Sequence, residues 1–135
     1  MNSKYNKRSN ASGFTMIELL IVMVILGLLA SLVAPSMFSK VDSSKIKAAE
    51  AQMQMLSTAL DTFRLDVGDY PDSLDELRAS SKRGWDGPYL PKDLPADPWS
   101  SDYFYQRSGS NYSLMSFGKD GKQGGDEDNA DIVYR

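Results

Sequence analysis

The chain contains neither cysteine nor histidine among its 135 residues. Without cysteine, no disulfide can cross-link an exported domain and no thiolate can act as a nucleophile or a metal ligand. Without histidine, a Ser-His-Asp triad, a Cys-His pair and a histidine-ligated zinc site are all excluded. The sequence also has no phosphate-binding glycine loop. These absences argue against an enzyme.

Cationic side chains are in the minority, with 15 Lys and Arg against 18 Asp and Glu and a formal net charge of −3. Three of the cations, Lys4, Lys7 and Arg8, precede residue 13, so the rest of the chain is more acidic than the total indicates. Proteins that bind nucleic acid by electrostatic attraction carry a basic surface. We therefore expect no nucleic-acid partner.

The longest apolar segment runs from Phe14 to Ala34 and contains one charged side chain, that of Glu18. A helix of about 20 residues reaches about 30 Å, the thickness of the hydrocarbon layer of a bilayer. A removable secretory signal is the alternative, but its apolar region spans only about 7–15 residues. The basic leader places the N-terminus in the cytoplasm by the positive-inside rule. The segment therefore predicts a single-pass anchor with the remainder of the chain outside the cytoplasm.

Glu18 needs a neutralising partner, because a carboxylate within lipid costs about 2.5–3.5 kcal/mol on insertion scales. An amino terminus made by cleavage after Gly13 is the most available cation. The run GFTMIE from Gly13 to Glu18, ahead of an aliphatic segment that ends near Pro35, resembles the type IV pilin family, which includes the pseudopilins of type II secretion. The resemblance implies that a prepilin peptidase cuts after Gly13 and methylates the new terminal Phe14. It also implies that Glu18 pairs with the terminal amine of a neighbouring copy in a helical homopolymer.

A second helical pattern follows Pro35. Apolar residues recur at alternating spacings of three and four, which places them on one face of a helix that Gly68 and Pro71 end. This face either forms a coiled-coil seam or packs on the domain's own sheet, and we favour the sheet because a compact domain follows. The members of the stripe are Ile46, Ala49, Met53, Leu56, Leu60, Phe63 and Val67.

Residues 69–101 form a loop-rich region that holds five of the six prolines. Ser73 and Glu76 are spaced as a capping box at the start of a short helix, Leu74 to Ser80. Tryptophans in such a region more often anchor an ordered loop than form a sugar-binding platform. We therefore favour the anchoring interpretation for the tryptophans of residues 69–101.

Strand-forming residues dominate 103–107 and 112–117, and turn residues 108–111 separate them. This pattern predicts a hairpin, to which 132–134 adds a short third strand. The predicted fold class is α+β, with a long N-terminal helix packed on a small antiparallel sheet.

The segment 117–132 carries five carboxylates and four glycines. Like charges this close repel unless water or a cation neutralises them, and calcium accepts 6–8 oxygen ligands in flexible geometry. Composition alone leaves a calcium site and a solvated acidic loop equally open. An EF-hand is excluded, because Gly121 and Lys122 follow Asp120 where oxygen ligands are required at alternating positions.

Three further runs, GPYL at 87–90, DPW at 97–99 and the SFG…DG…ADI pattern of 116–132, resemble the major pseudopilins of type II secretion. That resemblance implies a structural calcium ion in the C-terminal loop. The implied side-chain ligands are Asp120, Asp131 and, as the third carboxylate, Asp128, for which Asp126 or Glu127 is the alternative. Phe117 and Lys122 would contribute main-chain oxygens.

The resemblance also implies a function and a domain organisation. The chain would polymerise into the periplasmic pseudopilus of a type II secretion system and drive export of folded proteins through the outer membrane. Its partners would be copies of itself, the prepilin peptidase, an inner-membrane assembly platform, an indirectly acting cytoplasmic ATPase and minor pseudopilins. The expected parts are a cleaved leader (1–13), a membrane and filament-core helix (14–35) and a periplasmic domain (36–135), the last divided into a helix (36–67), a loop-rich region (69–101) and the sheet with its calcium loop (102–135).

Two rivals to this function remain. The first is the major pilin of a type IV surface pilus, used in adhesion, motility or DNA uptake, which shares the pattern of residues 13–35. The second is an enzyme or ligand-binding domain on a single-pass anchor. A pair of carboxylates such as Asp126 and Asp128 is capable of acid–base chemistry, but it lies in a glycine-rich loop with no evident pocket.

Cleavage after Gly13 makes a specific prediction for the mature chain. In cells with an active prepilin peptidase, the N-terminal peptide should begin at Phe14 and carry a methyl group on its amine. Mass spectrometry of protein extracted from membranes measures both features, and cells that lack the peptidase provide the control. An intact Met1 terminus in cells with active peptidase would refute the prediction.

Overall fold

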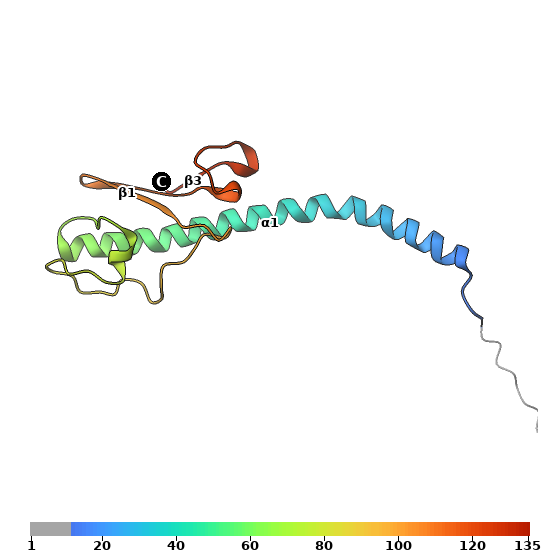
Figure 1. The fold of residues 1–135 in the computed structure, drawn as a ribbon, viewed down its shortest axis with the longest axis horizontal. Coiled ribbons are helices and arrows are strands. Elements are labelled where there is room, and N and C mark those ends of the chain that lie inside the picture. Colours follow the sequence, from blue (N-terminus) through green and yellow to red (C-terminus); the bar gives the residue numbers. More distant parts are fainter. Residues whose placement is uncertain (1–11) are drawn as a thin grey trace, which may run out of the picture. The chain divides into compact units, whose positions relative to one another are not determined.

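The computed structural model describes residues 12–135, so the basic leader side chains lie outside the described residues. Helix α1 (Met16–Val67) is followed by the 3-10 turn η1 (Leu74–Leu77) and by strands β1 (Phe104–Ser108), β2 (Asn111–Ser116) and β3 (Ile132–Val133) (Figure 1). Two more 3-10 turns, η2 (Gly118–Asp120) and η3 (Glu127–Asn129), lie between β2 and β3. The chain divides within α1 into two compact units, which meet between Phe38 and Ser39 and are described separately.

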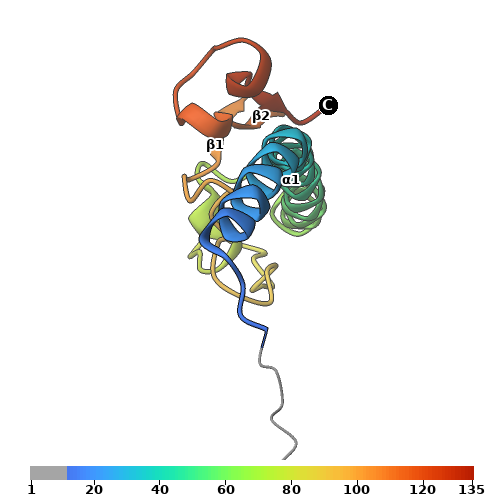
Figure 2. The ribbon, with the colours of Figure 1, turned by 90° about the vertical axis from the view of Figure 1, so that its right-hand side faces the viewer.

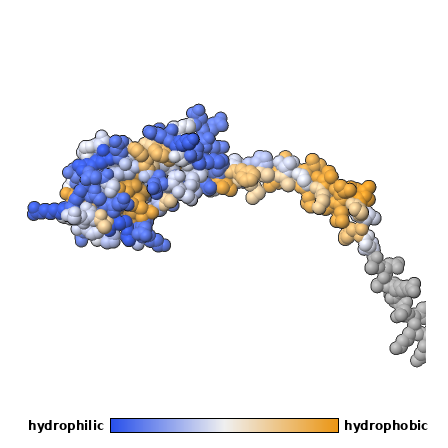
Figure 3. Space-filling model, viewed as in Figure 1, coloured by the Kyte–Doolittle hydropathy of each residue, from blue (hydrophilic) through white to orange (hydrophobic). Residues whose placement is uncertain are grey.

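The first unit is helical from Met16 onward, and α1 continues through Pro35 without interruption. Its side chains are exposed at every position from residue 12 to Phe38. The helix is long and apolar enough to cross a membrane, and no part of its most apolar stretch is buried by residues 12–135. Figure 3 shows this part of the helix largely in orange. The predicted apolar helix is thus present, and it has no packing partner in the described chain.

The second unit contains the hydrophobic core. Five members of the predicted stripe are buried, namely Ala49, Met53, Leu56, Leu60 and Phe63. Leu77, Leu90, Tyr103 and Leu114 pack with them from the loop-rich region and the sheet. Both views of this unit place the sheet and the loop-rich region on different sides of α1 (Figures 1 and 2). The expectation that the stripe packs on the domain's own sheet is confirmed.

The sheet is antiparallel throughout, in the order β1-β2-β3. Phe104 pairs with Met115 at one end of the hairpin, and Ser116 pairs with Ile132 where β2 meets β3. The turn between β1 and β2 has two residues, and Gly109 adopts the positive φ of 58° that such tight turns require. The predicted hairpin and third strand are present with boundaries shifted by about one residue, and the α+β class is confirmed.

The start of the loop-rich region differs from expectation. The helix expected over 74–80 is a single 3-10 turn, η1, and the Ser73 side chain makes no capping hydrogen bond. The capping-box prediction is therefore wrong. Glu76, its intended partner, instead accepts a hydrogen bond from the Asp72 N–H at 2.9 Å and pairs with Lys82 at 3.1 Å.

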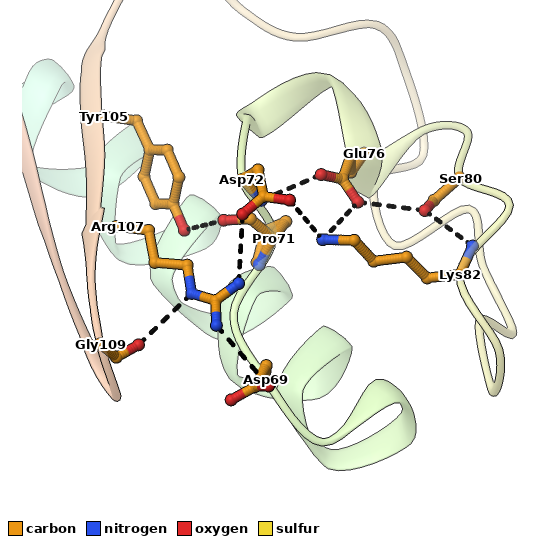
Figure 4. Close-up of polar contacts among 9 residues, drawn as sticks. All are labelled: Asp69, Pro71, Asp72, Glu76, Ser80, Lys82, Tyr105, Arg107 and Gly109. Carbon is orange, nitrogen blue, oxygen red and sulfur yellow. Dashed lines mark hydrogen bonds and ion pairs between the residues drawn. The ribbon is translucent and has the colours of Figure 1, made fainter.

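Arg107 on β1 connects the sheet to the segment that follows α1 (Figure 4). Its guanidinium lies 3.1 Å from an Asp72 carboxylate oxygen and 3.6 Å from one of Asp69. The neighbouring Tyr105 hydroxyl donates to the Pro71 carbonyl at 2.6 Å. These bonds hold the chain against β1 immediately after the helix ends.

Lys82 extends the same polar network to the far side of η1, where its ammonium lies 2.9 Å from Asp72 (Figure 4). The hydrogen bond and positive charge of Lys82 lower the pKa of Asp72 below its usual value. Burial alone would raise the pKa of Glu76, but hydrogen bonds from the Asp72 backbone, Lys82 and Ser80 lower it overall. Both carboxylates therefore stay ionised at neutral pH, and the ion pairs they form are partly exposed and individually weak.

Trp85 anchors the middle of the loop-rich region, as the anchoring interpretation predicts. Its indole N–H donates to the Glu76 carbonyl at 2.8 Å. Its ring meets Tyr89 edge-on with 5.8 Å between centroids, and Tyr89 in turn meets Phe63 of α1 at 5.6 Å. The aromatic contacts thus extend the hydrophobic core from α1 into the loop-rich region.

Leu60 and Leu65 lie on the same helix, but Leu60 is fully buried and Leu65 is 85% exposed. In a fragment of residues 39–135, which contains the whole core, Leu60→Ala should lower the free energy of unfolding by about 2–5 kcal/mol, because it leaves a cavity. Leu65→Ala, the matched control, should change it by less than about 0.5 kcal/mol. Urea unfolding followed by circular dichroism measures the free energy of unfolding of both variants. Equal decreases for the two would contradict the buried position of Leu60.

Candidate functional site

Two parts of the chain carry the predicted site residues, and the first is the start of α1. Gly13 and Phe14 precede the helix, and the Phe14 side chain is 86% exposed. Glu18 lies in the first helical turn. A carboxylate here is stabilised by the positive end of the helix dipole. The residues predicted for processing and assembly are therefore adjacent and accessible.

Thr15 and Glu18 form a reciprocal capping box. The Thr15 N–H donates to Glu18 Oε2 at 2.8 Å, and the Glu18 N–H donates to Thr15 Oγ1 at 3.2 Å. Both N–H groups lack helical acceptors, so the box satisfies two unpaired donors at once. The sequence analysis missed the role of Thr15, although its signal, a threonine three residues before a glutamate, stands in the motif itself.

The surface around Glu18 is apolar. An open groove beside the carboxylate is lined by Phe14, Leu19, Ile21 and Val22. A carboxylate has about four lone-pair sites, so Glu18 retains acceptor capacity beyond the bond from Thr15. The start of α1 therefore presents one anionic acceptor within an apolar surface, which suits an apolar partner that carries a single cation.

The second part is the loop between β2 and β3. The pairing of Ser116 with Ile132 closes its base, and η2 packs against η3 within it. Gly118 has a φ of 70°, and a β-carbon there would lie only 2.8 Å from the Ala130 carbonyl oxygen. Glycine is therefore required where the two arms of the loop approach each other. Lys119 also ties the loop to α1 through an ion pair with Asp42 at 3.5 Å.

The predicted calcium ligands occupy different environments in this loop. Asp131 Oδ2 accepts a hydrogen bond from the Gly124 N–H at 2.8 Å, whereas its Oδ1 is buried and has no hydrogen-bond partner. Asp120 Oδ1 accepts from the Lys122 N–H at 3.1 Å, and the Asp120 side chain is exposed. The candidates for the third carboxylate, Asp126, Glu127 and Asp128, are exposed as well. Within residues 12–135, no three acidic side chains lie close enough together to hold a metal ion.

A calcium ion fits this loop best at Asp131. A buried carboxylate oxygen without a partner costs free energy, and a bound cation would remove that cost. The loop also offers main-chain carbonyls, which together with carboxylates are the ligands that calcium prefers. The donor chemistry is therefore suitable, while the ligand roles of Phe117, Asp120, Lys122 and Asp128 stay predictions.

Comparison with known proteins gives two family matches, one over the N-terminal segment and one over the domain that follows. Residues 36–135 match the family model described as type II secretion system (T2SS), protein G. Residues 8–34 match the model described as prokaryotic N-terminal methylation motif. The methylation-motif match covers the predicted cleavage junction and the start of α1, and the protein G match covers the whole domain that follows.

Individual relatives agree with these matches along nearly the whole chain. The type II secretion system core protein G of Pseudomonas aeruginosa is 38% identical over 136 aligned residues, which cover 93% of this chain and 96% of the relative. The protein of the same name from Vibrio cholerae is 35% identical over 136 aligned residues, covering 93% and 92%. The crystal structure of the major pseudopilin from the type 2 secretion system of enterohaemorrhagic Escherichia coli superposes with a TM-score of 0.59 at 28% identity, covering 70% of this chain and 86% of that one.

Proposed function

We infer the function from one premise: this chain belongs to the protein G family of the type II secretion system. It is a structural subunit of that system's pseudopilus, as its relatives and the pseudopilin structure indicate. Its role is to assemble with other subunits rather than to catalyse a reaction. The rival role, as the major pilin of a surface fibre, is not favoured, because the match over residues 36–135 is to the secretion protein.

The observation that carries this proposal is the exposed apolar half of α1. Large apolar side chains remain 50–85% exposed along it, from Met16 at 85% to Val22 and Ile25 at 50%. Burying apolar surface is worth about 25 cal/mol per Å², so this surface needs a partner outside its own chain. Lipid supplies that partner before assembly, and the same helix of other copies supplies it in the filament.

Glu18 gives that assembly its register. A prepilin peptidase that cuts after Gly13 creates a cationic amine at Phe14, four residues from Glu18. Within lipid, an ion pair between the Glu18 carboxylate of one copy and the Phe14 amine of the next neutralises two charges that are each costly alone. Only one longitudinal offset between neighbouring helices brings these groups together.

The domain of residues 36–135 lies in the periplasm in this proposal, and the apolar helix anchors the unassembled subunit in the inner membrane. The matched methylation motif supports processing by a prepilin peptidase. The inner-membrane assembly platform and the minor pseudopilins are the further partners. The filament built from these subunits drives folded proteins through the outer membrane.

Calcium completes the domain by stabilising the β2–β3 loop. Asp131 and Asp120 would hold the ion with their carboxylates, Asp128 would supply the third carboxylate, and Phe117 and Lys122 would contribute main-chain oxygens. The ion, when bound, supplies positive charge among the five carboxylates and links the two arms of the loop. The unpartnered Oδ1 of Asp131 supports this part of the proposal.

Replacing Glu18 tests the assembly proposal. Glu18→Ala should leave the amount of membrane-inserted protein unchanged and strongly reduce the amount of secreted protein in the culture medium. The physical reason is that removing one partner of a buried ion pair costs about 3–5 kcal/mol. The measurement compares the medium of a deletion strain complemented with each variant.

Glu50→Ala is the matched control, since Glu50 is an exposed carboxylate on the same helix outside the apolar half. It should secrete like the wild type. Normal secretion with Glu18→Ala would contradict the pairing, and a deletion strain that secretes normally but loses surface pili would support the rival function.

The calcium proposal predicts a metal-dependent melting temperature for a fragment of residues 39–135. At a calcium concentration of a hundred times Kd, binding adds about 2.7 kcal/mol of stability. Asp131→Asn should remove most of the difference between calcium and chelator, and Asp102→Asn, an exposed carboxylate outside the loop, should retain it. If the wild-type fragment melts at the same temperature in calcium and in chelator, the metal proposal is refuted.

A further inference from the structure

Asp97 is a buried carboxylate in the loop-rich region, with only 4% of its surface exposed. Its Oδ1 accepts hydrogen bonds from the Trp99 N–H at 3.0 Å and the Ser101 N–H at 2.8 Å. The backbone of the same turn adds a bond from the Asp97 N–H to the Ser101 carbonyl at 2.8 Å. The 97–101 turn is therefore held rigidly around this carboxylate.

The other oxygen of Asp97 reaches the sheet. Ser116, the last residue of β2, is completely buried, and its hydroxyl donates to Asp97 Oδ2 at 2.6 Å. A hydroxyl has one proton to donate and two lone pairs that can accept. The serine proton is thus committed to Asp97, and the serine oxygen is left as an acceptor. It accepts the Gly118 N–H at 3.2 Å.

This last bond fixes the orientation of a peptide group at the entrance of the acidic loop. The Gly118 N–H and the Phe117 carbonyl belong to one peptide group, which is planar and trans. When Ser116 holds the N–H, the carbonyl of Phe117 must point the opposite way. Asp97, through Ser116, therefore sets the direction of the main-chain oxygen that is the proposed calcium ligand at residue 117.

The 97–101 turn borders the loop at a second point. A β-carbon placed on Gly121 would lie 3.4 Å from Ser101 Oγ, which is ordinary contact distance. Gly121 follows η2 and donates its N–H to the Gly118 carbonyl at 3.3 Å. The turn thus borders the end of η2, the segment that contains Asp120, and is linked to its start through Ser116.

We propose that Asp97 and Ser116 are positioning residues for calcium binding, which orient the Phe117 carbonyl and η2 before the ion arrives. The inference rests on the calcium site proposed above. Ligands held in place in the free protein lose little conformational freedom on binding, so their supports raise affinity without touching the ion. A purely structural role would lower the stability of the fold and leave the affinity of the folded protein unchanged.

Calcium affinity of the full chain, purified in detergent, separates the two roles. Isothermal titration with calcium chloride would be run at a temperature where near-UV circular dichroism shows the calcium-free protein to be folded. Ser116→Ala should raise Kd by about 10-fold to 100-fold, the range found for supporting residues of metal sites. Ser113→Ala, an exposed serine on the same strand, should leave Kd unchanged.

Asp97→Asn gives an independent variant if Ser116→Ala does not fold. It keeps the size of the side chain and an oxygen for the Trp99 and Ser101 N–H groups, but the serine proton loses its carboxylate acceptor. It should raise Kd in the same direction. A folded variant with unchanged Kd would overturn the positioning role, and so would two variants that stay unfolded even with calcium. Absence of binding by the wild type would instead refute the calcium site itself.

Discussion

The apolar half of α1 has no packing partner within residues 12–135, and the organisation of the molecule depends on that constraint. The same helix changes its surroundings along its length. Up to Phe38 every described side chain is exposed, whereas from Ala49 to Phe63 one face is buried under the domain. In the proposed function, lipid or other copies bury the first half, whereas the second half packs on its own sheet and loops. One continuous helix would then couple membrane insertion, folding and assembly.

The domain stabilises its irregular half without disulfides. Residues 69–101 contain little regular structure, and fixing each loop residue costs about 1–2 kcal/mol of conformational entropy. Aromatic contacts from Phe63 through Tyr89 to Trp85 extend the core into this region. Arg107 then connects it to the edge strand β1, and the buried Asp97 connects it to the end of the central strand β2. These connections hold the loop-rich segment in place against α1 and the sheet.

Local sequence patterns predicted much of this arrangement because helices and strands have fixed periods. The three-and-four spacing identified the buried face of α1, and two segments of strand formers separated by turn residues 108–111 identified the hairpin. Short polar motifs were less reliable, because other nearby groups compete for the same side chain. Glu76 pairs with Lys82 and accepts the Asp72 N–H instead of bonding Ser73. Thr15 and Glu18 bond each other as their motif predicts, and the capping box forms.

The hydrogen bond between Asp97 and Ser116 could not be predicted from the sequence for a different reason: 19 positions separate the two residues, and no periodicity relates them.

The physical importance of this hydrogen bond follows from what the acidic loop lacks. Between Phe117 and Ile132 there is little apolar surface to bury, and the carboxylates repel one another. A cation balances the charge but does not by itself choose among loop conformations, since calcium tolerates variable geometry. In our proposal, the peptide group fixed at the base of the loop favours one conformation, and a calcium ion would then bind a loop whose first turn is already in place.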